Sequence, residues 1–248
     1  FKHADTILVL NDSAKRNIVK HLGIPESKIV LMPNGVNNKV YTPIKDRGFI
    51  KGLKKKHNLG NDKVLFHVGS VCPRKNQLGI IKSLKDIMKE RNIRLLYAGG
   101  IIDNEYFQEI QAYVKNEGIE RNVIYLGEVK PGKDLNEYYN LADAFIFHST
   151  SEAFGLVPLE ALSAGNPVFM SENLKNYFYP KSSTDGFIYF NEKNAKQIIK
   201  KYFFDDKFIK RASKEALEYI RKNFSWDAVA EKHLALFEKI IEKENQKE

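Results

Sequence analysis

Short apolar runs alternate with amphipathic helical stretches along most of this chain, and no other feature limits the possible folds as strongly. A strand that is apolar at every position is typical of a sheet covered on both faces. Repeated strand–helix–strand units built on such strands predict a parallel sheet, and right-handed crossovers make it a doubly wound α/β fold. The expected strands are 4–10, 29–32, 64–68, 93–98, 123–126, 144–147, 167–170 and 187–190.

Helical periodicity fills the segments between these strands. Leu78, Ile81 and Leu84 recur three residues apart, which places them on one helical face. The pair Asn34-Gly35 predicts a turn after the second strand. Residues 41–43 and the charged stretch after them are expected to form a linker. Further helices are expected at about 13–22, 106–114, 135–142, 156–164 and 226–243, and three helical stretches close the chain.

The composition is that of a globular protein, with 43% hydrophobic and 29% charged residues among 248. No apolar run approaches the length of a transmembrane helix. The single cysteine, Cys72, excludes an intramolecular disulfide framework and is typical of a reducing compartment. We therefore expect a cytoplasmic protein, and peripheral association with the inner face of the membrane stays open.

Forty Lys and Arg residues against 31 Asp and Glu leave a net charge of +9. Such an excess favours nucleic acid, a membrane surface or phosphorylated small molecules as partners, and a lysine-rich soluble surface is the alternative. The densest basic run is 54–56, which has no interleaved aromatic residues. It is interpreted as a solvated helix face, so no nucleic-acid partner is expected.

In a doubly wound sheet the ligand lies beyond the carboxyl ends of the strands. One loop at such an end begins with Gly69, where the absence of a side chain lets backbone approach a ligand. Arg74 and Lys75 follow, and we expect them at the start of a helix, where backbone amides already favour an anion. A bound diphosphate would explain two cations there, although both could also point to solvent.

The segment 149–161 carries the second loop. Gly155 predicts a tight turn, and Pro158 suits the first turn of the helix that follows. Amides at this helix start would bind an anion, whereas Glu152 and Glu160 would accept hydrogen bonds from hydroxyl groups. A ligand with phosphates and hydroxyls on either side is a sugar nucleotide. The alternative for each glutamate is support of the helix dipole or cap.

Glu152 and Glu160 are separated by seven residues, with Phe154-Gly155-Leu156 between them. This segment resembles the signature of retaining glycosyltransferases of the family 4 type, which have the GT-B fold. The resemblance covers nearly the whole chain, and its further matching segments are 69–76, 122–129, 141–144, 161–168 and 224–226.

The resemblance implies a role for each matched residue. Lys75 and Glu152 would act at the reaction centre, with Lys75 on the diphosphate and Glu152 on the transferred sugar. Glu160 would bind the ribose hydroxyls. The complete set implied to bind the nucleotide sugar is Gly69, Ser70, Arg74, Lys75, Gly99, Gly100, Val129, Lys130, Glu152, Ala153, Phe154, Gly155, Leu156 and Glu160, with the glycines making room for the nucleotide and Val129-Lys130 near the base.

The implied reaction transfers a hexosyl group from a UDP- or GDP-linked sugar to a glycan, a lipid-linked or a small-molecule acceptor, with retention of anomeric configuration. Neither a metal nor another cofactor is implied, and the sequence contains no Asp-x-Asp pair of the kind that holds one. The alternatives are another GT-B enzyme, such as a sugar-nucleotide epimerase or a phosphorylase, and a non-catalytic module that binds nucleotides or anionic surfaces.

The sequence departs from the family pattern in two places. Ser70 stands where the family usually has an arginine, so either Arg74 replaces that guanidinium or the phosphates bind more weakly. The family's acidic, glycine-containing loop is replaced at 171–185 by a tyrosine-rich segment to which we assign no role. His148, beside the signature loop, is expected to have a structural role.

The resemblance also implies a division of the chain. Residues 1–43 would be the tail of an amino-terminal acceptor domain, residues 44–225 the domain that binds the nucleotide sugar, and residues 226–248 a helix that crosses back towards the first domain. On this interpretation the chain is incomplete, and it would bind nucleotide but transfer sugar weakly or not at all by itself.

Overall fold

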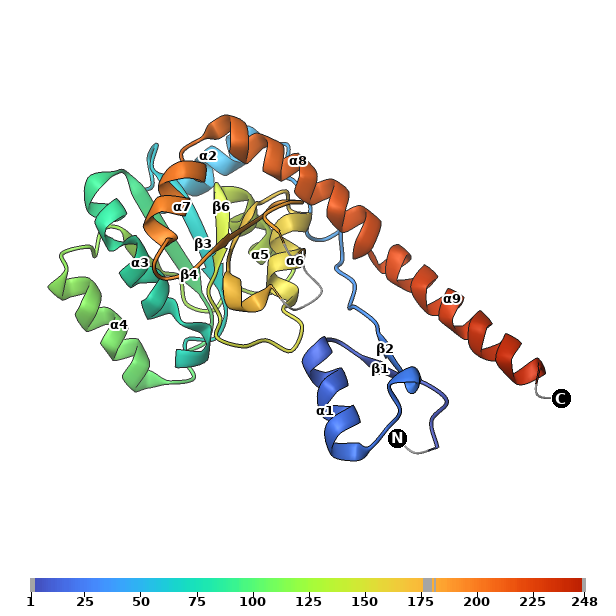
Figure 1. Ribbon diagram of the computed structural model, residues 1–248. Helices are drawn as coiled ribbons and strands as arrows, with labels where there is room; N and C mark the ends of the chain where they lie inside the picture. The colour runs from blue at the N-terminus through green and yellow to red at the C-terminus, as the bar shows by residue number, and fades with distance from the viewer. Residues whose placement is uncertain (1–2, 176–179, 181, 247–248) are drawn as a thin grey trace.

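The structure is a computed structural model that describes residues 3–175, 180 and 182–246. Its centre is a six-stranded sheet with all neighbouring strands parallel, in the order β5-β4-β3-β6-β7-β8 (Figure 1). The strands are β3 (Lys63–Val68), β4 (Ile93–Ala98), β5 (Val123–Tyr125), β6 (Ala144–Phe147), β7 (Val168–Ser171) and β8 (Phe187–Phe190). The predicted doubly wound parallel sheet is confirmed.

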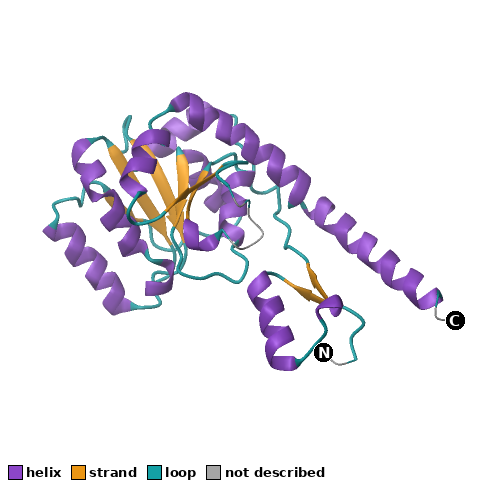
Figure 2. Cartoon of the chain, in the orientation of Figure 1, coloured by secondary structure: helices purple, strands orange, loops and turns teal. Residues whose placement is uncertain are grey.

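Helices cover both faces of this sheet (Figure 2). Neighbouring residues of β3 point to opposite faces, so Phe66 lies in one hydrophobic cluster and Leu65 in the other. The first cluster includes side chains of α5 (Lys133–Leu141), α6 (Leu156–Ser163) and α8 (Asp206–Asn223), and the second includes those of α3 (Gln77–Glu90), α4 (Asn104–Asn116) and α7 (Ala195–Tyr202). The sheet is therefore the buried middle layer, which explains its continuously apolar strands.

The strand order reverses between β3 and β6, which pair side by side through Leu65 with Ala144 and Phe66 with Phe145. The loops that leave their carboxyl ends therefore meet. Thr150 donates its backbone N–H to the carbonyl of Arg74 at 2.8 Å. This contact is at the switch point of the sheet, where doubly wound folds bind ligands.

A small unit precedes this sheet. Strands β1 (Ile7–Val9) and β2 (Ile29–Leu31) pair in parallel, and helix α1 (Asp12–Leu22) connects them with the short 3₁₀ helix η1 (Glu26–Lys28). Asn11 caps α1 by accepting from the Ala14 N–H, and Gly23 ends it with φ of 63°. The elements predicted here are confirmed.

Two local predictions are wrong. The expected linker contains α2 (Arg47–Lys56), which Asp46 caps by accepting from the Phe49 N–H. The basic run within it was correctly interpreted as helical, but the helix begins earlier. Gly35 makes no turn; a Cβ atom there would overlap the ring of Trp226, so this glycine permits close packing.

Trp226 begins the last helix, α9 (Trp226–Asn245), which projects from the body of the molecule (Figure 1). Leu234, Phe237 and Ile241 on it are at least half exposed. Across the described ranges, no helix combines the length and apolar character that membrane crossing requires. The tyrosine-rich centre of the segment 171–185, at 176–179 and 181, lies outside the described residues, and the 3₁₀ helix η3 (Glu172–Leu174) precedes it.

Candidate active site at the switch point of the sheet

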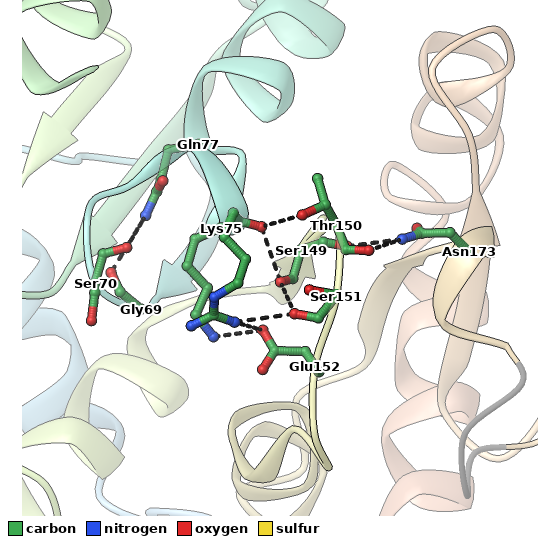
Figure 3. Close-up of polar contacts among 10 residues, drawn as sticks. Gly69, Ser70, Lys75, Gln77, Ser149, Thr150, Ser151, Glu152 and Asn173 are labelled. Carbon is green, nitrogen blue, oxygen red and sulfur yellow. Dashed lines mark hydrogen bonds and ion pairs between the residues drawn. The ribbon is translucent and has the colours of Figure 1, made fainter. Parts of the chain in front are cut away.

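The centre of the site is an ion pair between Lys75 and Glu152 (Figure 3). The Lys75 Nζ atom is 2.6 Å from Glu152 Oε1, and their side chains are only 9% and 11% exposed. The ammonium also lies over the Phe147 ring, 5.3 Å from its centroid. Charges held away from water need partners of this kind, so the two predicted reaction-centre residues occur here as one unit.

Arg74 adds a second cation to the same carboxylate. Its Nη1 atom donates to Glu152 Oε1 at 3.2 Å and to the Ser151 carbonyl at 3.1 Å, and half of its side chain is exposed. Arg74 and Lys75, which were expected at the start of a helix, lie in a single helical turn directly before the α-helix. They lie in a 3₁₀ turn, η2 (Pro73–Lys75), which Asn76 ends with φ of 53° before α3 begins at Gln77. This left-handed residue turns the chain, so the two side chains face the loop after β6.

The loop that begins at Gly69 is held by a residue that sequence reasoning missed. Gln77 donates from Nε2 to the Ser70 carbonyl at 2.9 Å and to the Gly69 carbonyl at 3.4 Å. A Cβ atom at Gly69 would be 3.2 Å from the Lys75 stem, and one at Gly99 would overlap the Gly69 backbone. These glycines therefore let the protein's own loops pack closely, whatever they also do for a ligand.

The remaining predicted residues of this edge lie beside that loop. A Cβ atom at Gly100 would overlap the Glu128 carboxylate, which belongs to the loop after β5. Val129 in the same loop packs against the first hydrophobic cluster, whereas Lys130 is exposed and its carbonyl accepts from the Leu135 N–H at 3.2 Å. The structure thus places Val129 and Lys130 at the carboxyl edge, in the loop whose Glu128 lies against Gly100.

Glu160 occupies a different environment from Glu152. Its Oε2 atom accepts from the Tyr139 hydroxyl at 3.0 Å, and burial raises the pKa of its carboxyl group above the ordinary value. Hydrogen bonds from Tyr139 and Tyr41 oppose that rise. In turn, burial and the nearby Glu160 charge raise the pKa of both tyrosines. Glu160 is on α6, one turn inside the helix, as predicted.

The segment between the two glutamates turns at Gly155, whose φ of 79° requires glycine. Gly155 is also the cap residue of α6 and has no side chain with which to close the helix start. Phe154 is 4% exposed and packs near Phe224 in the first cluster, so its side chain is part of the core and only its backbone could face a ligand. Leu156, by contrast, is 40% exposed.

Two histidines lie behind the ion pair. His67 is fully buried, its Nδ1 atom donates to the Ile146 carbonyl at 3.0 Å, and its Nε2 atom has no partner in the described chain. Burial lowers the pKa of His67 to about 4. His148 packs near Phe190 and its Nδ1 atom is 3.1 Å from Asn76 Nδ2, which fits the structural role expected for it.

Helix α1 faces the site across a hollow of about 590 Å³. On the α1 side its walls include Asn11, Ser13 and Asn17, and on the other side Arg74 and Glu152. In the part of the chain that the structure describes, this hollow included, no group of three His, Cys, Asp or Glu side chains could hold a metal ion.

Residues of the site that were not predicted include Asn11, Tyr41, His67, Gln77 and Tyr139. Tyr139 belongs to an expected helix, but nothing in its periodicity separates a core tyrosine from one that contacts Glu160. His67 lies within an apolar strand, and a polar residue in such a run could have indicated a buried polar side chain. The Asn11 contact with Ala153 depends on tertiary packing, and the Gln77 contacts depend on how the loop after β3 folds back onto the start of α3.

Comparison with known proteins gives the site a family. The model of the glycosyl transferases group 1 family matches residues 50–223, which hold both the Lys75 loop and the two glutamates. This chain belongs to that family.

Curated relatives match over most of this chain. An uncharacterized glycosyltransferase of Methanocaldococcus jannaschii is 23% identical over 95% of this chain and 60% of its own length. A D-inositol 3-phosphate glycosyltransferase of Corynebacterium glutamicum is 25% identical over 98% of this chain and 59% of its own length. The chain thus spans about three fifths of the length of these relatives.

Solved structures share the fold. The Anabaena protein HepE, in complex with UDP, superposes with a TM-score of 0.84 at 16% identity, over 96% of this chain and 65% of its own. The C-terminal domain of a glycosyl transferase group 1 protein from Francisella tularensis gives 0.66 at 17% identity, over 77% of this chain and all of its own. The six-stranded part of this chain therefore has the architecture of a GT-B glycosyltransferase.

Proposed function

We propose that this chain is the part of a glycosyltransferase that binds the nucleotide-diphosphate sugar, with residues 44–225 as the binding domain. The observation that carries the proposal is the buried Lys75–Glu152 pair at the switch point of the sheet, with Arg74 beside it. A cation that is kept away from water beside a polar hollow is suited to an anionic ligand. Membership of the glycosyl transferases group 1 family makes a sugar nucleotide the expected ligand.

Each group has a distinct task in this proposal. Lys75 and Arg74 neutralise the diphosphate, which develops charge as the sugar departs, so they stabilise the transition state. Glu152 and the Ala153–Leu156 backbone orient the transferred sugar, and Glu160 accepts from ribose hydroxyls. Arg74 supplies the guanidinium that Ser70 cannot, because it points at the same carboxylate as Lys75.

The finer features follow from the family resemblance. We propose transfer of a hexosyl group with retention of configuration and without a metal, from a UDP- or GDP-linked donor. The UDP complex of HepE favours the uridine nucleotide. The acceptor site is assigned to the amino-terminal side, of which residues 1–43 would be a part, and α9 would cross towards it. A cytoplasmic location, with peripheral contact with the membrane, belongs to the same proposal.

Isothermal titration with UDP, GDP and ADP tests the nucleotide site. We expect one of the three to bind, and absence of binding by all three would contradict the proposal. Product analysis on the intact protein tests the reaction, since transfer yields nucleoside diphosphate and a glycoside. Epimerised sugar nucleotide or sugar phosphate would instead identify an epimerase or a phosphorylase.

Replacement of Glu160 tests its ribose role. Glu160→Ala should weaken nucleotide binding by about tenfold because hydroxyl groups lose a charged acceptor. Glu137→Ala, an acidic residue on α5, is the matched control. Unchanged affinity of Glu160→Ala for nucleoside diphosphate would remove Glu160 from the site.

A further inference from the structure

Asn11 makes the hydrogen bond that joins the start of α1 to the signature loop, residues 149–155. It is 8% exposed, and its Nδ2 atom donates to the Ala153 carbonyl at 2.5 Å. These two residues are 142 positions apart in the chain. A buried amide that joins two segments so distant in sequence fixes one of them relative to the other.

The orientation of this amide is set by its second contact. Asn11 Oδ1 accepts from the Ala14 N–H at 2.7 Å, which is the N-cap bond of α1. Because the oxygen is held by the helix, the NH₂ group must point away from it, towards Ala153. One side chain therefore both caps α1 and holds the loop that carries Glu152.

The loop held in this way forms one wall of the 590 Å³ hollow. Ser151, Glu152 and Ala153 line it from the loop, and Ser13 and Asn17 line it from α1. A shift of the Ala153 backbone would change the width of the hollow and the direction of the Glu152 carboxylate. Lys75 belongs to the loop after β3 and Glu160 to α6, and among the described residues neither side chain is hydrogen-bonded to Ala153, so the nucleotide contacts assigned to them should change less.

We infer that Asn11 is a positioning residue for the sugar end of the nucleotide-sugar site, acting through Ala153 on Glu152. This inference rests on the proposed function, because it assigns the sugar to this hollow. It also makes α1 a determinant of sugar affinity, although α1 lies outside the segment 50–223 that the family model matches.

The test separates the two contacts of the amide. Asn11→Asp keeps a good helix cap but replaces the NH₂ donor by a carboxylate oxygen that repels the Ala153 carbonyl. Asn11→Ser keeps the cap and adds no charge, but it replaces the amide donor by a shorter hydroxyl group. Asp46→Ala removes the cap of α2 at the other edge of the sheet and serves as the control for loss of a cap.

The readout is the ratio of the dissociation constants for UDP and UDP-glucose, measured by calorimetry, with GDP and GDP-mannose in parallel. Asn11→Asp and Asn11→Ser should reduce this ratio about tenfold while UDP affinity changes by less than about threefold. A purely structural role would weaken both ligands together and lower the thermal midpoint. Asp46→Ala should leave the ratio unchanged.

The outcomes distinguish the two proposals. If the wild-type protein binds no nucleotide, the proposed function fails, and the role of Asn11 fails with it. If the wild-type protein prefers a nucleotide sugar and the Asn11 variants keep that preference, only the role of Asn11 is overturned. If the Asn11 variants lose affinity for UDP and for UDP-glucose by the same factor, the positioning role of Asn11 is also overturned.

Discussion

The carboxyl and amino edges of the six-stranded sheet both carry cations. Each edge holds some of them in ion pairs, such as Arg94 with Asp62 at the amino edge, but most cations of helix α2 at that edge have no such partner among the described residues. At the carboxyl edge, Lys75 is buried against Glu152 and Arg74 reaches the same carboxylate. At the amino edge, residues 44–63 hold seven Lys or Arg and two Asp, which is +5 of the net +9. Of the helix α2 cations there, Lys54 has an ion pair with Asp143 at 3.9 Å, and Lys51 and Lys55 have none among the described residues.

The difference shows why net charge is a poor guide to a site. An exposed lysine keeps its hydration and contributes little to stability, whatever its neighbours are. A buried lysine has lost that hydration, so its position implies a compensating partner or ligand. The cations of residues 44–63 thus say less about the position of a binding site than the single Lys75–Glu152 pair at the opposite edge.

Lys75→Ala should give the largest effect. It leaves Glu152 buried with only the half-exposed Arg74 beside it, so we expect a loss of about 3 kcal/mol in the free energy of unfolding, followed by urea denaturation. Nucleotide affinity should fall roughly 100-fold. Lys55→Ala on α2 should change stability by less than about 0.5 kcal/mol. Similar losses for both variants would break the comparison.

Acidification should destabilise the protein through His67, the buried histidine near the carboxyl edge. The pKa of His67 is lowered to about 4 in the folded protein, against about 6.5 when unfolded. Its neutral form therefore contributes stability that is complete above pH 6.5 and is lost as the pH falls towards 4, by about 3 kcal/mol. His67→Gln should show a shallower fall of the free energy of unfolding over this range. Parallel slopes for both proteins would contradict the assignment.

Glu152→Gln should raise the affinity for UDP. In the free protein the Glu152 carboxylate is paired with Arg74 and Lys75, the two cations that a phosphate would contact. We expect a gain of about fivefold from removal of this negative charge. The additional affinity contributed by the sugar should fall in the same variant. Glu120→Gln changes the net charge equally in an exposed turn and is the control. Weaker UDP binding by Glu152→Gln would show that the carboxylate does not compete with phosphate.

The smallest effect is expected at the amino edge. Replacing Lys51 and Lys55 together by Gln should leave UDP affinity within about twofold at physiological salt, because charges more than about 8 Å apart are screened there. The same titration at low salt should show a modest loss of UDP affinity. A large loss at physiological salt would mean that α2 takes part in nucleotide binding after all.

The sequence predicted the sheet because β-strands buried on both faces leave a continuous apolar pattern, as in Phe145 to Phe147. It predicted the position of Glu160 because a glycine and a proline mark the helix start. It did not predict the first part of α2, before the basic run 54–56, because its glycines and charged residues resemble a linker and none of its residues is buried. Nor did it predict the Lys75–Glu152 pair or the Asn11 contact, since both join segments far apart in the chain.

The neighbouring positions of β3 and β6 have a consequence for how the protein folds. The chain between these two strands contains β4 and β5. Pairing of β3 with β6 therefore closes a large loop, which costs conformational entropy. The ion pair of the site cannot form until that closure is complete. We expect nucleotide binding to appear in the last kinetic phase of refolding, later than most of the helical circular dichroism signal.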